Sequence, residues 1–153
     1  MTPVQSHDIS NWLVTEAPTL PSCRHVLEQL VARLNENGME LNRVSFGIDV
    51  LHPELLGKAY VWERTGQHVS EREIHHCIQS TNQYLNNRYS LLNDGELSVR
   101  RNPADPGAIE EFPMMEELRD AGATYYIAIA LPRSDGNLYR TSWSTDREDG
   151  FTD

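Results

Sequence analysis

Near its end, the sequence contains two apolar segments separated by Ser-Asp-Gly-Asn, and no other part of the chain limits the choice of fold as strongly. Asp and Gly accept the backbone angles of a tight hairpin turn, so we predict that residues 124–131 and 138–145 pair as antiparallel strands. Both alternating sets of positions in the first strand are apolar or aromatic: Tyr125, Ile127, Ile129 and Leu131, then Tyr126, Ala128 and Ala130. A strand of this kind is covered on both faces, which predicts a layered domain around a sheet.

The residues before this hairpin begin with an arm and a helix. Ser22 is a good N-cap, and the apolar residues after it recur at helical spacing, which predicts a helix over 22–37. Residues 1–21 form an N-terminal arm that contains a short helix, with Trp12 and Leu13 as its expected anchor on the main body. Prolines near the end of this arm are expected to interrupt regular structure before the helix over 22–37 begins.

Apolar periodicity in the middle of the chain predicts the remaining elements. These are strands over 42–52 and 58–64, a helix over 70–92, a strand over 96–101 and a helix over 109–123. The first two strands are expected to be a hairpin or near neighbours. The order of elements predicts an α+β domain with a central antiparallel sheet and helices packed on it.

Composition excludes several classes of function. The 153 residues include 13 Lys and Arg against 23 Asp and Glu, a formal net charge of −10, and no basic cluster is present. This balance argues against binding of nucleic acid or of an anionic membrane surface. Two separated cysteines do not indicate a disulfide scaffold, and neither a signal peptide nor a long apolar run is visible. We therefore expect a cytoplasmic protein.

The end of the chain resembles the end of the N-terminal regulatory region that precedes class III adenylate or guanylate cyclase catalytic domains in bacteria. The matching residues are Leu118, Gly122, Ala123, Thr124, Tyr126, Leu131, Pro132, Ser134, Asp135, Gly136, Ser142, Trp143, Thr145, Asp146, Arg147, Gly150, Phe151 and Asp153. The segment VLHPELLGKAYVW also follows the order of this family. The strand-turn-strand segment at the end of the chain is similar to that of GAF-type small-molecule sensor domains.

This resemblance implies a GAF-like regulatory or sensory domain that passes a signal to a C-terminal cyclase domain absent from this chain. Residues 1–153 then form one domain, with 1–21 as the arm, 22–148 as the core and 149–153 as the start of a linker to the catalytic domain. Class III cyclases work as dimers, so a homodimer is implied. Without that catalytic domain, the chain itself is not expected to be an enzyme.

Aromatic residues on the predicted strands are the candidates for a small-molecule pocket. The candidate pocket residues are His52, Tyr60, Trp62, Tyr126 and Trp143. Apolar walls with a few polar groups are typical of ligand sites, although aromatic residues on strands are also ordinary core residues. His52 can equally fix the turn in which it lies. A dimerisation and positioning module with a filled interior is therefore the alternative to a sensor.

Histidines in the middle of the chain raise a third alternative, a metal or haem sensor. His68, His75 and His76 have side chains that ligate zinc or haem iron. In a helix, however, neighbouring side chains point about 100° apart, so His75 and His76 would not ligate one ion. No cofactor is predicted on this basis, and no catalytic spacing motif is present.

Overall fold

The computed structural model describes residues 3–51, 53–75, 95–135 and 138–151. Its strands are β1 (Leu41–Asp49), β2 (Leu55–Glu63), β3 (His68–His75), β4 (Ser98–Arg101), β5 (Tyr125–Pro132) and β6 (Leu138–Thr145). They form one sheet in the order β3-β2-β1-β6-β5-β4, in which all neighbours are antiparallel. The helices are α1 (Pro3–Thr15), the 3-10 helix η1 (Ala17–Thr19), α2 (Cys23–Glu36), α5 (Pro106–Glu111) and α6 (Met114–Asp120).

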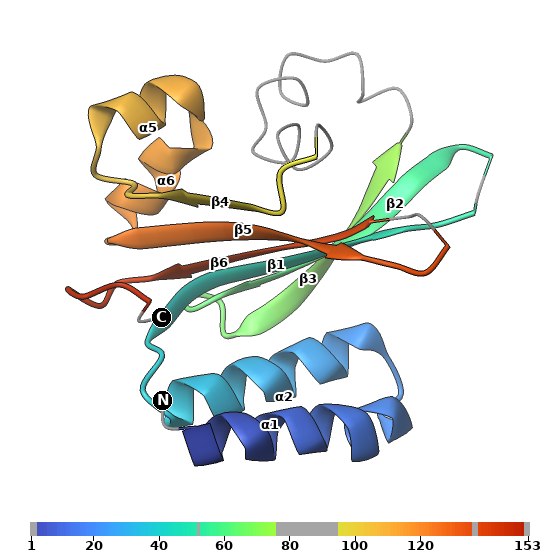
Figure 1. Ribbon diagram of the computed structural model, residues 1–153. Helices are drawn as coiled ribbons and strands as arrows, with labels where there is room; N and C mark the ends of the chain where they lie inside the picture. Colours follow the sequence, from blue (N-terminus) through green and yellow to red (C-terminus); the bar gives the residue numbers. More distant parts are fainter. Residues whose placement is uncertain (1–2, 52, 76–94, 136–137, 152–153) are drawn as a thin grey trace.

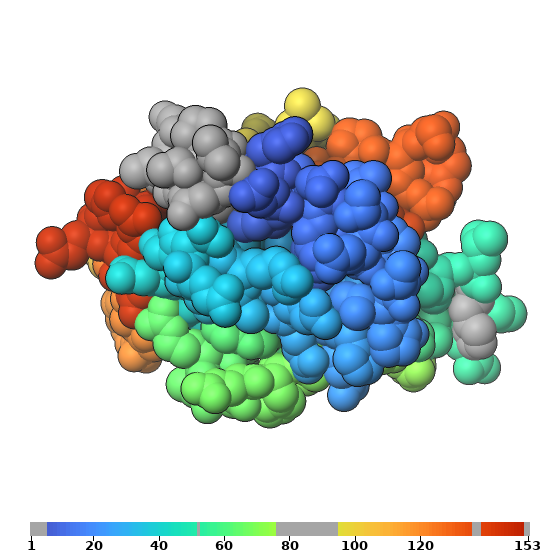
Figure 2. All heavy atoms as spheres, turned by 90° about the horizontal axis from the view of Figure 1, so that it is seen from below, coloured from blue at the N-terminus to red at the C-terminus, as the bar shows by residue number. Residues whose placement is uncertain are grey.

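Helices pack on both faces of the sheet. Helices α1 and α2 lie on one face, and α5 and α6 lie on the other face near β4 and β5 (Figure 1). Seen from below, the side chains of α1 and α2 cover much of the molecule, with β3 in green beside them (Figure 2). None of the helices in the described ranges is long and apolar enough to cross a membrane.

Each face has its own apolar core. The core beneath α1 and α2 consists of Ile9, Leu27, Val31, Leu34, Leu41, Val44, Tyr60, Trp62 and Val69. The core beneath α5 and α6 consists of Val99, Ala108, Phe112, Met115, Leu118, Ala123, Tyr126, Ala128 and Ala130. Strands of this sheet therefore contribute apolar side chains in both directions, as expected for a sheet between two helical layers.

Several predicted elements are confirmed. The helix over 22–37 is α2, the strands over 42–52 and 58–64 are the antiparallel pair β1 and β2, and the closing hairpin is β5 and β6. The short strand near residue 100 is β4, which pairs with β5. The α+β class with a central antiparallel sheet is therefore correct.

Two predicted helices are wrong. The segment from Ser70 was predicted to begin a helix, but residues 68–75 are the edge strand β3, which pairs with β2 along its length. Only Val69 is buried in β3, and pairing with β2 overrides the local helical signal. The remainder of that prediction, 76–92, lies outside the described residues. The helix over 109–123 is instead two helices, because Pro113 restricts Phe112 to an extended conformation and ends α5.

Polar side chains are buried in one place, along the β1–β6 pair. In the described part of the chain, the buried polar residues are Ser45, Thr141, Ser142, Ser144 and Thr145. The Ser45 and Ser142 hydroxyls lie 2.5 Å apart, and the Thr141 hydroxyl donates to the Ser45 carbonyl at 2.9 Å. Because buried hydroxyls need partners at defined positions, these contacts favour one register between the strands.

A glycine in β2 allows close approach of the neighbouring strand, which gives a first prediction. A Cβ at Gly57 would lie 2.5 Å from the Ile48 carbonyl oxygen, whereas one at Gly47 would lie 3.6 Å from the nearest backbone oxygen. We expect Gly57→Ala to lower the free energy of unfolding by about 2 kcal/mol and Gly47→Ala by less than about 1 kcal/mol, measured by urea denaturation. Equal effects of the two substitutions would contradict this packing.

Candidate functional site

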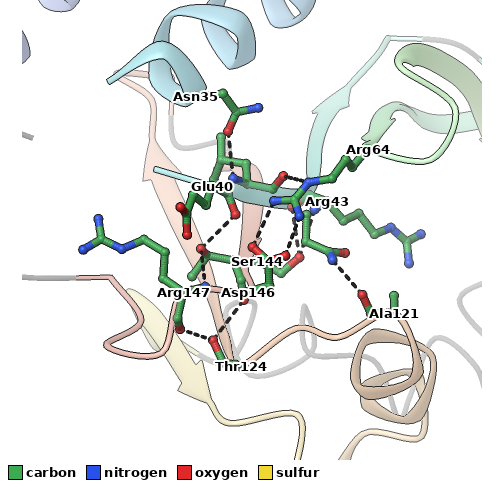
Figure 3. Close-up of polar contacts among 12 residues, drawn as sticks. Asn35, Glu40, Arg43, Arg64, Ala121, Thr124, Ser144, Asp146 and Arg147 are labelled. Carbon is green, nitrogen blue, oxygen red and sulfur yellow. Dashed lines mark hydrogen bonds and ion pairs between the residues drawn. The ribbon is translucent and has the colours of Figure 1, made fainter. Parts of the chain in front are cut away.

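Beyond β6, the chain folds back onto the sheet and forms a polar junction with three other segments (Figure 3). We define this junction as Arg64, Thr124 and residues 145–151, together with the α2–β1 loop, 37–40. Thr145 is fully buried, and its hydroxyl lies 2.9 Å from the carbonyl oxygens of both Met39 and Glu40. The last residue of β6 is therefore fixed to the loop that leads into β1.

Arg64 connects the β2–β3 turn to this junction. Its two terminal nitrogens bond both carboxylate oxygens of Asp146, one of them at 3.0 Å, and its Nε donates to the Leu41 carbonyl at 3.0 Å. The hydrogen bonds from Arg64 hold the pKa of the Asp146 carboxyl below its ordinary value, although burial opposes this shift. One side chain thus holds the end of β6, the start of β1 and the β2–β3 turn together.

Arg147 and Thr124 hold the segment that follows. Arg147 donates to the Gly38 carbonyl at 3.1 Å and bonds the Asp149 carboxylate at 2.7 and 3.0 Å. The Thr124 hydroxyl donates to the carbonyl of Arg147, and its backbone N–H donates to the Thr145 carbonyl at 2.9 Å. These contacts attach the segment to both the start of β5 and the end of α2.

Aromatic packing completes the junction. The rings of Phe151 and Tyr125 are 5.7 Å apart at an interplanar angle of 86°, an edge-to-face contact. Gly150 lies directly against the Tyr125 ring, where a Cβ would approach to 3.0 Å. Phe151 also packs on the core beneath α1 and α2. Residues 145–151 are therefore packed on the domain.

The predicted pocket residues do not come together in one wall. Tyr60 and Trp62 are buried in the core beneath α1 and α2, and Trp143 packs against the same core. In the register, Trp62 and Trp143 both lie opposite Val44, one on each side. Tyr126 belongs to the core on the other face of the sheet. His52 lies outside the described residues. A ligand role for these residues stays a prediction.

The predicted metal ligands are also apart. His68 and His75 are exposed at the first and last positions of β3, and seven steps along a strand separate them by about 23 Å. The Nδ1 atom of His68 lies 2.8 Å from the Gly66 carbonyl oxygen. His76 lies outside the described residues. Within the ranges that the structure describes, no three His, Cys, Asp or Glu side chains are grouped to hold a metal ion.

Next to the junction lies a cleft of about 230 Å³. Its lining residues are Asn42, Arg43, Glu63, Arg64, Thr65, Glu117, Leu118 and Ala121, from the start of β1, the β2–β3 turn and α6. The Asn42 amide donates to the Ala121 carbonyl at 3.0 Å and so ties α6 to β1 beside the cleft. Sequence reasoning did not single out Arg43 or Arg64, because their partners are distant in the chain.

The fold is similar to that of a known sensor domain. The solved structure of the GAF domain of a two-component sensor histidine kinase from Bacillus halodurans matches with a TM-score of 0.54 and 14% sequence identity. The match covers 87% of this chain and 82% of that one. No protein-family model and no curated protein matches the chain. The GAF-like α+β fold is therefore shown.

The Arg64–Asp146 ion pair gives a prediction about pH. Because the pKa of Asp146 is lowered in the folded state, its contribution to stability is present above the ordinary pKa of Asp and is lost as the pH falls through the lower, folded-state value. We expect Asp146→Asn to destabilise the protein by about 1 kcal/mol at pH 7, since both side chains are partly exposed. The difference from the wild type should shrink as the pH falls below about 4.

Urea denaturation at pH 7 and at acidic pH measures this difference. Asp149→Asn is the matched control, because Asp149 bonds Arg147, two positions away in the same segment, and its side chain is 58% exposed. We expect this control to remain close to the wild type at pH 7. A loss of stability in Asp149→Asn as large as that in Asp146→Asn would contradict the special position of Asp146.

Proposed function

We propose that this chain is a regulatory domain of a bacterial class III adenylate or guanylate cyclase, which transmits a signal to a C-terminal cyclase domain. The GAF-like fold supports a sensory or regulatory class, since the solved neighbour is a domain of a sensor histidine kinase. One observation supports the finer assignment. Several residues that carry the resemblance to the cyclase family also build the junction. They are Thr124, Thr145, Asp146, Arg147, Gly150 and Phe151.

The mechanism that this arrangement favours is a shift between two populations of the junction. Arg64 links the exit of β6 to the β2–β3 turn, and Thr145 links it to the α2–β1 loop. A signal that moves either segment changes the free energy of these contacts and so the position of residues 149–151. The cyclase domain would then respond to the geometry of the segment that enters it.

We extend the proposal to a homodimer in which α1 takes part. Trp12 of α1 is buried and stacks beneath the Arg33 guanidinium, 4.1 Å from the ring centroid. Its neighbours Leu13 and Val14 are 37% and 77% exposed, so α1 is held by Trp12 while an apolar strip remains accessible. Apolar residues that are exposed next to one another favour contact with another chain.

Sedimentation velocity tests the dimer. We expect the wild type to sediment as a dimer and Val14→Glu to shift the population towards monomer, because a buried carboxylate without a partner opposes association. Leu97→Glu, which adds the same charge at an apolar residue that is 67% exposed and lies outside α1, is the matched control. A monomeric wild type, or a dimer unaffected by Val14→Glu, would contradict the role of α1.

A ligand-free positioning module is the second candidate. The observation in its favour is that Tyr60, Trp62 and Tyr126 are each at most 8% exposed, so these candidate pocket residues are enclosed by protein. Such a module would dimerise and set the geometry of a following domain without binding a small molecule. A metal or haem sensor receives no support from the described histidines.

The test of the cyclase proposal begins with the codons that follow Asp153. We expect them to encode a class III catalytic domain, and the full-length protein to form cyclic nucleotide. Asp146→Asn in that protein should change the cyclase rate by about fivefold or more, as is typical of coupling between domains, while Glu110→Gln, an exposed change on α5 outside the junction, leaves it unchanged. A reading frame that ends at Asp153 or enters an unrelated domain would refute the proposal.

A further inference from the structure

Arg43 is the residue of the cleft whose bonding is incomplete. Its side chain is only 20% exposed, and its Nε is buried and has no hydrogen bond to any residue that the structure describes. The nearest carboxylates form ion pairs instead, with Glu63 Oε1 3.4 Å from Nε and Glu117 Oε2 3.9 Å from Nη1. Figure 3 shows this guanidinium pointing away from the junction. Because Nε is buried, a molecule in the cleft would meet the terminal nitrogens of the Arg43 guanidinium, where the ion pair with Glu117 is long, at 3.9 Å, and leaves room for a closer acceptor.

The charges around Arg43 restrict which acceptor fits. Arg64, the other cation of the cleft, is occupied by both oxygens of Asp146. Glu63 and Glu117 then leave an excess of one negative charge around Arg43. A simple anion would be repelled by these two carboxylates, whereas a simple cation would leave the Arg43 donors without an acceptor. A molecule with one carboxylate and one ammonium group satisfies both requirements.

Size and surface restrict the ligand further. The cleft of about 230 Å³ is smaller than the sites that usually bind drug-sized molecules. Besides its charged residues, it is lined by Leu118 and Ala121, which offer apolar surface at the end of α6. The side chains of Glu63 and Glu117 are 50% and 79% exposed and are therefore accessible from solvent.

We propose that this cleft binds a free α-amino acid with a small apolar side chain. The terminal nitrogens of Arg43 would donate hydrogen bonds to the carboxylate, Glu63 and Glu117 would bind the ammonium group, and Leu118 with Ala121 would contact the side chain. This site goes beyond the proposed function and does not depend on a cyclase domain. Because Arg64 lines the cleft and also bonds Asp146, a bound amino acid would lie beside the Arg64 link of the junction.

Isothermal titration calorimetry of the 153-residue chain tests the site. The probes are glycine, alanine, valine and leucine, with N-acetyl-valine and valinamide as analogues that lack the ammonium or the carboxylate charge. We expect valine or another of the four to bind with a Kd on the order of 1 mM or tighter, and each valine analogue to bind about tenfold or more weakly than valine. Binding of valinamide equal to that of valine would show a cation site, and equal binding of N-acetyl-valine an anion site; either overturns the proposal.

Variants connect the heat of binding to the cleft. Glu117→Gln changes a largely exposed side chain and should weaken binding about tenfold without affecting folding. Arg43→Met should abolish binding, and Arg24→Met, on the exposed surface of α2, is the matched control that should bind normally. If Arg43→Met fails to fold, Glu117→Gln alone decides. Absence of binding by all four amino acids, or unchanged binding by Glu117→Gln, overturns the proposal; neither result bears on the cyclase test.

Discussion

The pairing of β1 with β6 is the contact on which this domain depends. The strand order β3-β2-β1-β6-β5-β4 divides the sheet into two groups of three strands, and only the β1–β6 ladder joins them. The paired residues are about 100 positions apart, so closing this contact has a large entropic cost that neighbouring hairpins do not have. Each half alone would also leave an unpaired strand edge.

The chemistry of the β1–β6 pair explains how this cost is offset in one register. Apolar contacts alone would tolerate several alignments of two such strands, whereas buried hydroxyls must meet their acceptors. The Arg43 backbone N–H bonds the Ser144 hydroxyl at 3.1 Å, and an Arg140–Asp49 ion pair at 2.9 Å lies near the other end of the pair. The junction beyond Thr145 continues this polar contact past the end of the sheet. The exit of the chain is thus part of the same network that sets the register.

Local sequence patterns were sufficient to predict those elements whose main contacts are with residues nearby in the sequence. The β5–β6 hairpin and α2 follow from a turn and a helical repeat, and both were correctly predicted. The strand β3 was missed because the segment is polar and begins with a helix-capping pattern at Ser70, while its conformation is set by pairing with β2. The break at Pro113 had a visible signal in the sequence that the prediction did not use.

The functional features were harder to predict, for a related reason. Tyr60 and Trp62 stay predicted pocket residues, but alternation along a strand does not show that both belong to the core beneath α1 and α2. Arg64 and Asp146 are 82 positions apart, and Arg43 and Glu117 are 74 apart, so no local spacing connects them. The residues at the end of the chain form a packed junction, and this becomes visible only when the α2–β1 loop and the β2–β3 turn lie beside them.

The central claim, that the chain beyond β6 is a packed part of the domain, can be measured most directly by amide hydrogen exchange. The informative amides are Arg147, which bonds the Thr145 hydroxyl, and Gly150, which bonds the Arg147 carbonyl. Our account predicts that both exchange slowly, within about tenfold of the amides in the centre of β6. Exchange at the rate of an exposed loop, with β6 itself protected, would contradict it.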